Sequence, residues 1–180
     1  LRRQRQMCIR DSCYASSELA IRLARIAGAR LHILHVSTSK ELKLFSNEPL
    51  EDKNITSEAC VAHLLYTLSH YNSLGARIKC NPAIKRKTDR EALRAAVNSG
   101  LIDVIATDHA PHLLSEKEGG ALKAMSGMPM IQFSLVSMLG LVDEGIFSLE
   151  TLVQKMCHAP AQIYGICPVS YTHLTLPTKL

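Results

Sequence analysis

Residues 103–112 constrain this chain more than any other stretch, because they join a buried apolar run to a dense polar cluster. They read Asp-Val-Ile-Ala-Thr-Asp-His-Ala-Pro-His. The apolar part, residues 104–106, is typical of a buried parallel strand, and Asp108 follows its carboxyl end. In α/β barrels the reacting groups project from such strand ends. A helix N-cap followed by proline would explain the same residues without any function, but one aspartate and two histidines within five residues favour a functional site.

Strand-like and helical patterns alternate along the chain with short connections, which predicts a parallel sheet built from right-handed crossovers. The strand-like runs are residues 31–36, 55–61 and 101–106. Apolar residues recur at helical spacing in residues 16–28, 88–100, 148–156 and 160–165. We expect N-caps at Ser16 or Ser17, at Thr88 with Glu91 as its capping-box partner, and at Ser148.

Composition fits an ordinary globular domain with a substantial core, since 47% of the 180 residues are hydrophobic and 21% are charged. The longest apolar stretch, residues 130–142, is interrupted by Gln, Ser and Gly. It is too short to cross a bilayer, so we interpret it as a buried helix or a loop leading into one. A membrane-spanning protein is therefore not expected.

The net charge of +5 is concentrated at the two ends of the chain. Residues 1–12 hold four arginines against one aspartate, and residues 167–180 hold one lysine, which leaves +1 for residues 13–166. The body of the protein is thus nearly neutral, and no nucleic-acid partner is expected.

Both ends differ in character from the rest of the chain. Residues 1–12 lack the layout of a secretion signal and a helical apolar stripe, and residues 167–180 contain two prolines and no periodicity. We predict that both are non-native extensions, of the kind that translated adapter sequence would add, around a domain of residues 13–166. A natural basic arm and a natural tail are the alternative.

Four cysteines fall within the predicted domain and are widely spaced, with no Cys-x-x-Cys pair; they are Cys13, Cys60, Cys80 and Cys157. This pattern indicates free thiols in a reducing compartment more than a disulfide framework or a structural zinc site. A cytoplasmic protein is therefore expected.

Three motifs in order resemble dihydroorotases, which are zinc amidohydrolases. They are His-Ile-Leu-His-Val-Ser-Thr at residues 32–38, Asn-Pro-Ala at 81–83 and Thr-Asp-His-Ala-Pro-His at 107–112. The resemblance covers nearly all of residues 13–166 and separates the chain from dihydropyrimidinases and allantoinases, whose corresponding strand ends read differently. It implies an α/β fold that is part of a TIM (β/α)8 barrel of the metal-dependent hydrolase type, about strands 6 to 8 with their helices.

The resemblance also implies a role for each matching site residue. His35 corresponds to a zinc ligand. Asp108 corresponds to a residue that both coordinates the metal and moves a proton from the attacking water to the departing amide nitrogen. His112 and Asn81 correspond to substrate-binding residues, and His112 could hydrogen-bond a substrate carboxylate.

Other polar residues near these motifs have simpler interpretations. His32 precedes His35 by three residues and would point elsewhere on an alternating strand, so we interpret it as a packed or hydrogen-bonded histidine, or as one that supports a metal ligand, rather than as a ligand itself. His109 is expected to support the turn. His63 stands alone where the family often has paired histidines, and a buried structural histidine explains it at least as well. Glu58 could orient a neighbouring residue or pair with a lysine.

The function implied is the reversible cyclisation of N-carbamoyl-L-aspartate to L-dihydroorotate in pyrimidine biosynthesis, with Zn²⁺ as cofactor, binuclear in the full-length protein. Two alternatives remain open. One is a non-catalytic dihydroorotase-like partner of aspartate transcarbamoylase, and the other is a cyclic-amide hydrolase of the hydantoinase or allantoinase type. Aspartate transcarbamoylase as a partner and a homo-oligomer are both compatible with the resemblance.

Family members carry a His-x-His pair on the first barrel strand, and no such pair occurs in these 180 residues. The match begins at the helix before the sixth strand, so the chain corresponds to a fragment. His35 and Asp108 alone would not define a stable zinc site. We therefore predict that this polypeptide is inactive by itself and marginally stable or prone to aggregation, because a partial barrel leaves strand edges and apolar faces uncovered.

Overall fold

The computed structural model describes the backbone of residues 2–166 and the side chains of residues 11–166. The predicted tail, residues 167–180, lies outside the described residues. The first helix, α1 (Arg2–Ala27), begins well before the expected N-cap. Ser17 lies inside this helix and donates from Oγ to Glu41 Oε1 at 3.2 Å, so the capping prediction at Ser16 or Ser17 is wrong. The predicted end is confirmed, since Gly28 follows the helix with a φ of +62°.

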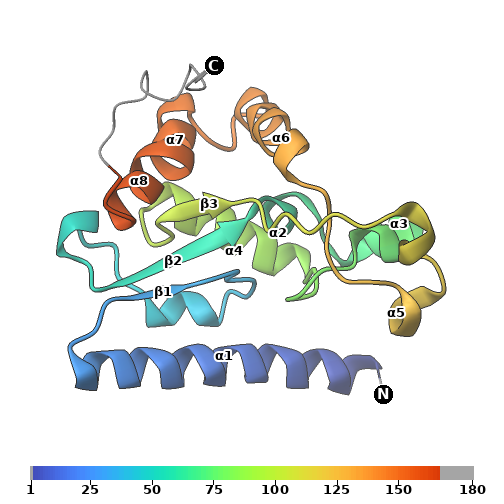
Figure 1. Cartoon of the computed structure of the whole chain (residues 1–180), viewed down its shortest axis with the longest axis horizontal. Helices are drawn as coiled ribbons and strands as arrows, with labels where there is room; N and C mark the ends of the chain where they lie inside the picture. The colour runs from blue at the N-terminus through green and yellow to red at the C-terminus, as the bar shows by residue number, and fades with distance from the viewer. Residues whose placement is uncertain (1, 167–180) are drawn as a thin grey trace, which may run out of the picture.

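Three parallel strands form the sheet in the described part of the chain, in the order β1 (Leu31–Ile33), β2 (Ile55–Cys60) and β3 (Val104–Ala106) (Figure 1). The registers pair Leu31 with Ile55 and Glu58 with Val104. The predicted strands are therefore confirmed in place and direction, although β1 and β3 are shorter than their apolar runs. Each strand lies beside the strand that precedes it in the sequence, so every connection joins neighbouring parallel strands.

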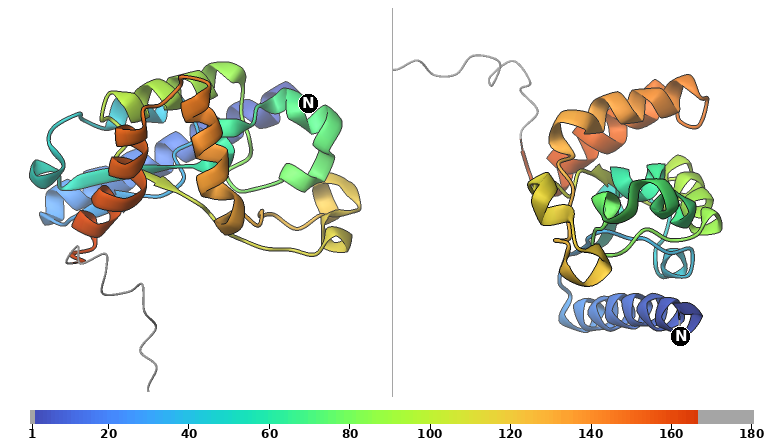
Figure 2. Two further views of the ribbon diagram at one scale, coloured as in Figure 1. Left: turned by 90° about the horizontal axis from the view of Figure 1, so that it is seen from above. Right: turned by 90° about the vertical axis from the view of Figure 1, so that its right-hand side faces the viewer.

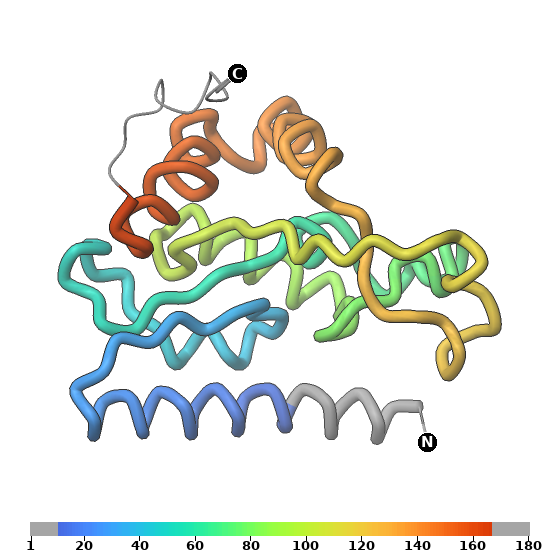
Figure 3. The backbone as a smooth tube through the Cα atoms, viewed as in Figure 1, coloured from blue at the N-terminus to red at the C-terminus, as the bar shows by residue number. Residues whose placement is uncertain are grey.

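Helices and 3₁₀ turns connect the strands and follow the last one (Figure 3). The α-helices after β2 are α2 (Val61–Leu65), α3 (Tyr71–Leu74), α4 (Lys87–Asn98), α5 (Gly120–Lys123), α6 (Ile131–Asp143), α7 (Leu149–Val153) and α8 (Ala159–Ile163). The 3₁₀ turns are Glu41–Leu44, Leu50–Asp52, Leu68–His70, Gly75–Ile78 and Leu114–Lys117. A π-helical turn, Gln154–His158, joins α7 to α8.

The caps of α4 and α7 show where local sequence decides a helix boundary and where it does not. Ser148 Oγ accepts from the Thr151 amide at 3.1 Å, which confirms the predicted cap of α7. The capping box predicted from Thr88 to Glu91 is wrong, because α4 begins at Lys87 and the Arg86 amide donates to Asp89 Oδ2 at 3.3 Å. Asp89 also accepts from the amide and hydroxyl of Ser39, so a tertiary contact selects the helix start.

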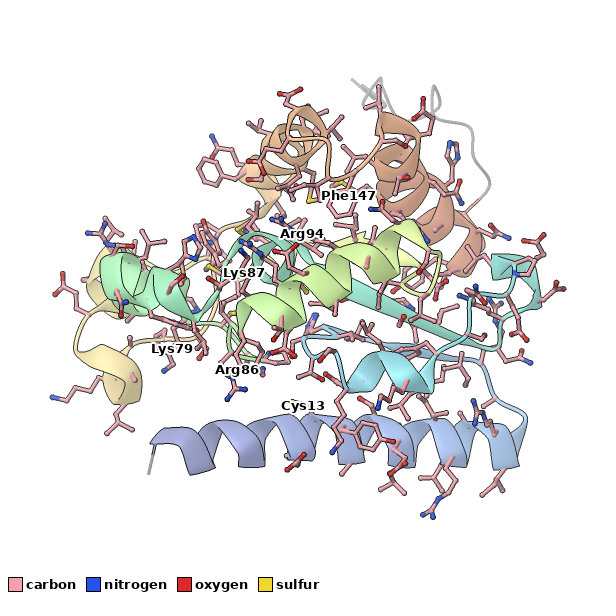
Figure 4. The ribbon with its side chains drawn as sticks, turned by 180° about the vertical axis from the view of Figure 1, so that it is seen from behind. Cys13, Lys79, Arg86, Lys87, Arg94 and Phe147 are labelled. Carbon is pink, nitrogen blue, oxygen red and sulfur yellow. The ribbon has the colours of Figure 1, made fainter. Side chains whose placement is uncertain are left out.

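The two faces of the sheet differ in polarity because side chains alternate along each strand. Ile33, Ala59 and Ile105 belong to the apolar core, which also contains Leu93 and Val97 of α4. Figure 4 shows α4 lying across this side of the sheet. The opposite face carries the polar side chains of His32, Thr56 and Glu58, together with Cys60. The strands thus place one polar row on the face that the core helices do not cover.

The apolar stretch of residues 130–142 forms α6, so its helical character is confirmed, but its predicted burial is wrong. Only Ser134, Met138 and Leu141 are buried in this helix. Its exposed apolar residues are Ile131, Phe133, Leu135, Val136 and Leu139. Figure 2 shows α6 standing away from the sheet with one side open. No helix among residues 2–166 combines the length and the apolar character that crossing a membrane requires.

Candidate metal centre

The centre lies where the chain leaves β1 and β3. His35 and Asp108 each follow their strand by two residues, and both have positive φ angles, +58° and +47°. No other non-glycine residue in the described part of the chain has a positive φ. This backbone conformation is strained for residues with a Cβ and is retained where surrounding contacts hold it, often at functional sites.

The His35 ring faces a different carboxylate with each of its nitrogens. Its Nδ1 lies 2.9 Å from Glu58 Oε1, and its Nε2 lies 3.5 Å from Asp108 Oδ1. We assign the proton on Nδ1 to the hydrogen bond with Glu58, which directs the Nε2 lone pair toward Asp108. The hydrogen bond to Glu58 raises the pKa of His35 against the opposing effect of burial, and the Asp108 charge adds to the rise.

Glu58 connects two histidines and is largely buried. Its Oε2 lies 3.2 Å from His32 Nε2, and His32 Nδ1 lies 2.8 Å from Thr56 Oγ1. Burial alone would raise the pKa of Glu58, but the hydrogen bonds from His32 and His35 outweigh it and lower the pKa to about 2. The prediction of His32 as a hydrogen-bonded histidine is confirmed. Its expected direction is wrong, because the chain leaves the strand pattern before His35 and both rings reach the same carboxylate.

His35, Glu58 and Cys60 offer donor atoms that all lie within 4.8 Å of one another, a grouping that could hold a metal ion. Cys60 Sγ lies 3.1 Å from His35 Nδ1, but burial raises the pKa of this thiol and favours its protonated form, which is a poor ligand. On the outer side of the ring, His35 Nε2 and the Asp108 carboxylate supply the nitrogen and oxygen donors that zinc binds. The donor chemistry therefore fits zinc better on the Asp108 side.

The two predicted substrate-binding residues lie on separate segments. His112 Nε2 donates to the Ser126 carbonyl at 3.0 Å, and its Nδ1 lies 3.6 Å from Glu116 Oε2. Asn81 is exposed and follows the 3₁₀ turn Gly75–Ile78. No hydrogen bond or ion pair within the described part of the chain joins either residue to His35 or Asp108. Their predicted roles stay predictions.

Two further histidines, His63 and His109, hydrogen-bond to the backbone. His63 is buried, and its Nε2 donates to the Pro82 carbonyl at 2.8 Å, whereas its Nδ1 has no partner among the described residues. Burial lowers the pKa of His63 to about 4, although the bond to Pro82 acts in the opposite direction. His109 Nδ1 accepts from the Ile131 amide at 3.0 Å and so supports the turn after β3.

The sequence predicts that one of residues 37–39 caps a helix begun by Lys40 and Glu41, but it does not show that the Glu41 side chain fixes the loop after His35. The Glu41 carboxylate accepts from the Thr38 amide at 3.2 Å, and the Glu41 amide donates to Thr38 Oγ1 at 3.2 Å. This reciprocal pair is a capping box, whose Thr-x-x-Glu signature is present in the sequence at residues 38–41. Glu41 also accepts from the Ser37 amide, so it holds the backbone directly after the strained His35.

Consecutive parallel strands with histidine and carboxylate groups at their carboxyl ends are the arrangement in which enzymes of the TIM-barrel type hold their reacting groups. Comparison with known proteins gives the family: the profile described as "Amidohydrolase family" matches residues 6–168. The chain belongs to the amidohydrolase family.

The four cysteines of the predicted domain are free thiols, as expected.

Several relatives and solved structures are similar to the chain. It is 40% identical over 144 residues to a dihydroorotase of Aquifex aeolicus and 35% identical over 146 residues to one of Trichlorobacter lovleyi, covering 80% and 81% of this chain and 34% of each relative. An L-hydantoinase (dihydropyrimidinase) from Arthrobacter aurescens superposes with a TM-score of 0.80 at 31% identity, covering 86% of this chain and 35% of that one. A Saccharomyces cerevisiae dihydroorotase in complex with 5-fluoroorotic acid shares the fold, with a TM-score of 0.75 at 18% identity, covering 86% and 43%. The chain thus spans about a third of the length of these curated relatives.

Proposed function

We propose that this chain is the later part of a dihydroorotase, which interconverts N-carbamoyl-L-aspartate and L-dihydroorotate. The observation that carries the proposal is the meeting of His35 Nε2 and Asp108 Oδ1 at 3.5 Å, within motifs that resemble those of dihydroorotases. The identity of 33–40% to several curated dihydroorotases supports it. A scaffold without catalysis would have no chemical need for this pairing.

Ring opening breaks the C–N amide bond of dihydroorotate while a water oxygen adds to the carbonyl carbon. A bound zinc ion, held by His35 and Asp108 together with ligands from the rest of the protein, would polarise the carbonyl and acidify the water. Asp108 takes a proton from that water and delivers it to the departing nitrogen. Glu58 orients His35, and His32 in turn fixes Glu58. His112 and Asn81 would bind the substrate carboxylate and ring.

The finer assignments belong to the same proposal. The three strands would be strands 6 to 8 of a (β/α)8 barrel, with a binuclear zinc centre completed by earlier strands. Residues 1–12 and 167–180 would be extensions of non-native origin. We place the protein in the cytoplasm, with aspartate transcarbamoylase or a second copy as candidate partners.

The first experiment uses the full-length protein that contains this chain. Its upstream sequence should contain a His-x-His pair, and the purified protein should carry zinc and open L-dihydroorotate. Absence of the pair, together with absence of turnover, would instead support the non-catalytic partner of aspartate transcarbamoylase.

The L-hydantoinase similarity favours a second candidate, another cyclic-amide hydrolase. The same full-length preparation assayed on L-dihydroorotate and on hydantoin separates the two. A higher kcat/KM for dihydroorotate is expected under the proposal. A higher kcat/KM for hydantoin would assign the protein to the hydantoinase type.

The 180-residue chain by itself should be inactive and marginally stable. Its exposed apolar side chains on α6, and Leu23 and Ile26 on α1, favour association in water. Circular dichroism melting and analytical ultracentrifugation should report a broad transition and aggregates. A sharp melt of a monomer with stoichiometric zinc and turnover would contradict this expectation.

A further inference from the structure

Lys117 is a buried lysine whose ammonium contacts three backbone carbonyl groups. Its Nζ donates to Lys79 O at 3.0 Å, to Met125 O at 2.8 Å and to Gly127 O at 2.7 Å. The residue is 8% exposed, and no carboxylate pairs with it in the part of the chain that the structure describes. Because a buried ammonium is costly without partners, three converging carbonyls at short distances mark a built arrangement rather than a chance contact.

The three carbonyls belong to the two segments that carry the candidate substrate-binding residues. Lys79 precedes Asn81 by two residues. Met125 and Gly127 flank Ser126, whose carbonyl accepts the hydrogen bond from His112 Nε2. The Gly127 amide also donates to Lys79 O at 2.8 Å, so the two segments meet at the carbonyl that Lys117 binds.

The segment around Gly127 is held by polar contacts and close backbone approach in addition to the buried side chains of Ala124 and Met128. Gly127 has a φ of +133°, and a Cβ built on it would lie 2.5 Å from Ala110 Cβ and 3.2 Å from His112 Nε2. Leu113, Leu114 and Leu122 in the same loop are all at least 71% exposed and do not anchor it. Lys79 adds a second lysine–carbonyl bond, from its Nζ to Ala124 O, and Figure 4 shows Lys79 beside this loop.

We propose that Lys117 is a positioning residue for substrate binding, which fixes the loop around His112 against the segment of Asn81. It does not touch the substrate. It sets the separation of two groups that do, so its loss should weaken binding more than chemistry. This inference rests on the proposed function, because the roles of Asn81 and His112 come from it.

The experiment replaces Lys117 with methionine in the full-length protein, which keeps the side-chain length and removes the charge and the donors. We expect KM for dihydroorotate to rise about tenfold while kcat changes by less than about twofold, since the lost charged hydrogen bonds order the site and do not move protons. Hydrogen exchange of residues 113–130 should become faster in the same variant. Lys117→Gln, which keeps a neutral NH₂ donor group without the charge, should give an intermediate KM.

The matched control is Lys155→Met, which removes a lysine that donates to the Ile102 carbonyl at 2.6 Å, before β3 and away from the loop. It should leave KM and the exchange of residues 113–130 unchanged. A Lys117→Met variant that melts earlier but keeps the wild-type KM would overturn the proposal. If that variant does not fold, a wild-type KM in Lys117→Gln would overturn it. If the wild-type protein lacks dihydroorotase activity, the proposed function fails. The hydrogen-exchange experiment still tests the loop in that case. Unchanged exchange of residues 113–130 in Lys117→Met would show that Lys117 does not order the loop, and it would overturn the proposal.

Discussion

Both ends of the sheet carry a cluster of ionisable groups, but the two clusters are built differently. At the carboxyl end, the side chains of His35 and Asp108 are each 27% exposed, and both residues have positive φ angles. At the amino end, Lys53 Nζ lies 2.7 Å from Asp103 Oδ1, and the two side chains are 2% and 4% exposed. Lys53 also donates to Gly100 O, and Asp103 accepts from the Ser57 amide.

This difference in exposure and pairing indicates a different role for the groups at each end of the sheet. At the amino end the charges are paired, enclosed and hydrogen-bonded to regular backbone, which suits stability. At the carboxyl end the two groups lie on separate turns, each with a positive φ, and both retain access to solvent, which suits ligand binding and proton transfer. Substitutions at the two ends should therefore separate activity from folding.

Under the proposed function, the largest effect is expected from Asp108→Asn in the full-length protein, because Asp108 is there both a zinc ligand and the proton acceptor. The amide cannot accept a proton and is a weaker ligand, so kcat should fall about 10⁴-fold, or about 5.5 kcal/mol in activation free energy. Initial rates with dihydroorotate measure this loss. Asp103→Asn at the amino end is the control and should keep kcat within about twofold, because its oxygen still accepts a hydrogen bond. Equal losses of kcat in the two variants would remove the distinction between the ends.

Lys53→Met tests the amino end. It leaves Asp103 buried without its cation, so the free energy of unfolding should fall by about 4 kcal/mol, while kcat/KM of the folded protein stays unchanged. Urea titration followed by circular dichroism measures the change. Lys43→Met is the control, since Lys43 is exposed and forms no ion pair among the described residues, so its substitution should change the free energy of unfolding by less than about 0.5 kcal/mol. A loss at Lys53 no larger than at Lys43 would contradict the structural role.

The positions of His35 and Asp108 could be predicted from sequence, because parallel strands bring residues at their carboxyl ends to one edge of the sheet. The hydrogen bonds that join Glu58 to both His32 and His35 could not be predicted from the sequence. They depend on the positive φ of His35, and a histidine gives no sign of such a backbone angle in the sequence. The three hydrogen bonds of Lys117 could not be predicted from the sequence either, because they go to backbone carbonyls, which any residue could provide.

Helices show the same limit at the level of packing. The apolar pattern of residues 130–142 predicted a helix correctly, but burial depends on what packs against it, and α6 keeps much of its apolar surface exposed. The start of α4 was likewise decided by the contact of Asp89 with Ser39 rather than by local capping signals. Local pattern fixes the type of element, whereas long-range contacts fix its ends and its surroundings.

The carboxyl end of the sheet should also make the free energy of unfolding depend on pH, through the buried ring of His63. His63 lies in α2, the helix that directly follows β2, and burial lowers its pKa to about 4 from the ordinary 6.5. The unfolded chain binds a proton at this ring below about pH 6.5, whereas the folded protein does so only near pH 4. The free energy of unfolding should therefore fall by about 3 kcal/mol as the pH drops through this window. Denaturation of wild type and His63→Gln between pH 7 and pH 4 checks this, and parallel curves would contradict it.

The smallest effect is expected from Glu58→Gln, which tests whether the hydrogen bond to Nδ1 orients His35. The neutral amide still fits beside the ring but holds it less strongly, so zinc affinity of the full-length protein should fall about 10- to 100-fold. Competition with a chromogenic chelator measures this affinity. Thr56→Val is the matched control, because it removes a hydrogen-bond partner of His32 and leaves Glu58 in contact with His35; its effect should stay below about threefold. If Glu58→Gln binds zinc as tightly as wild type, the strained backbone alone orients His35, and the polar row on the sheet serves stability at this end too.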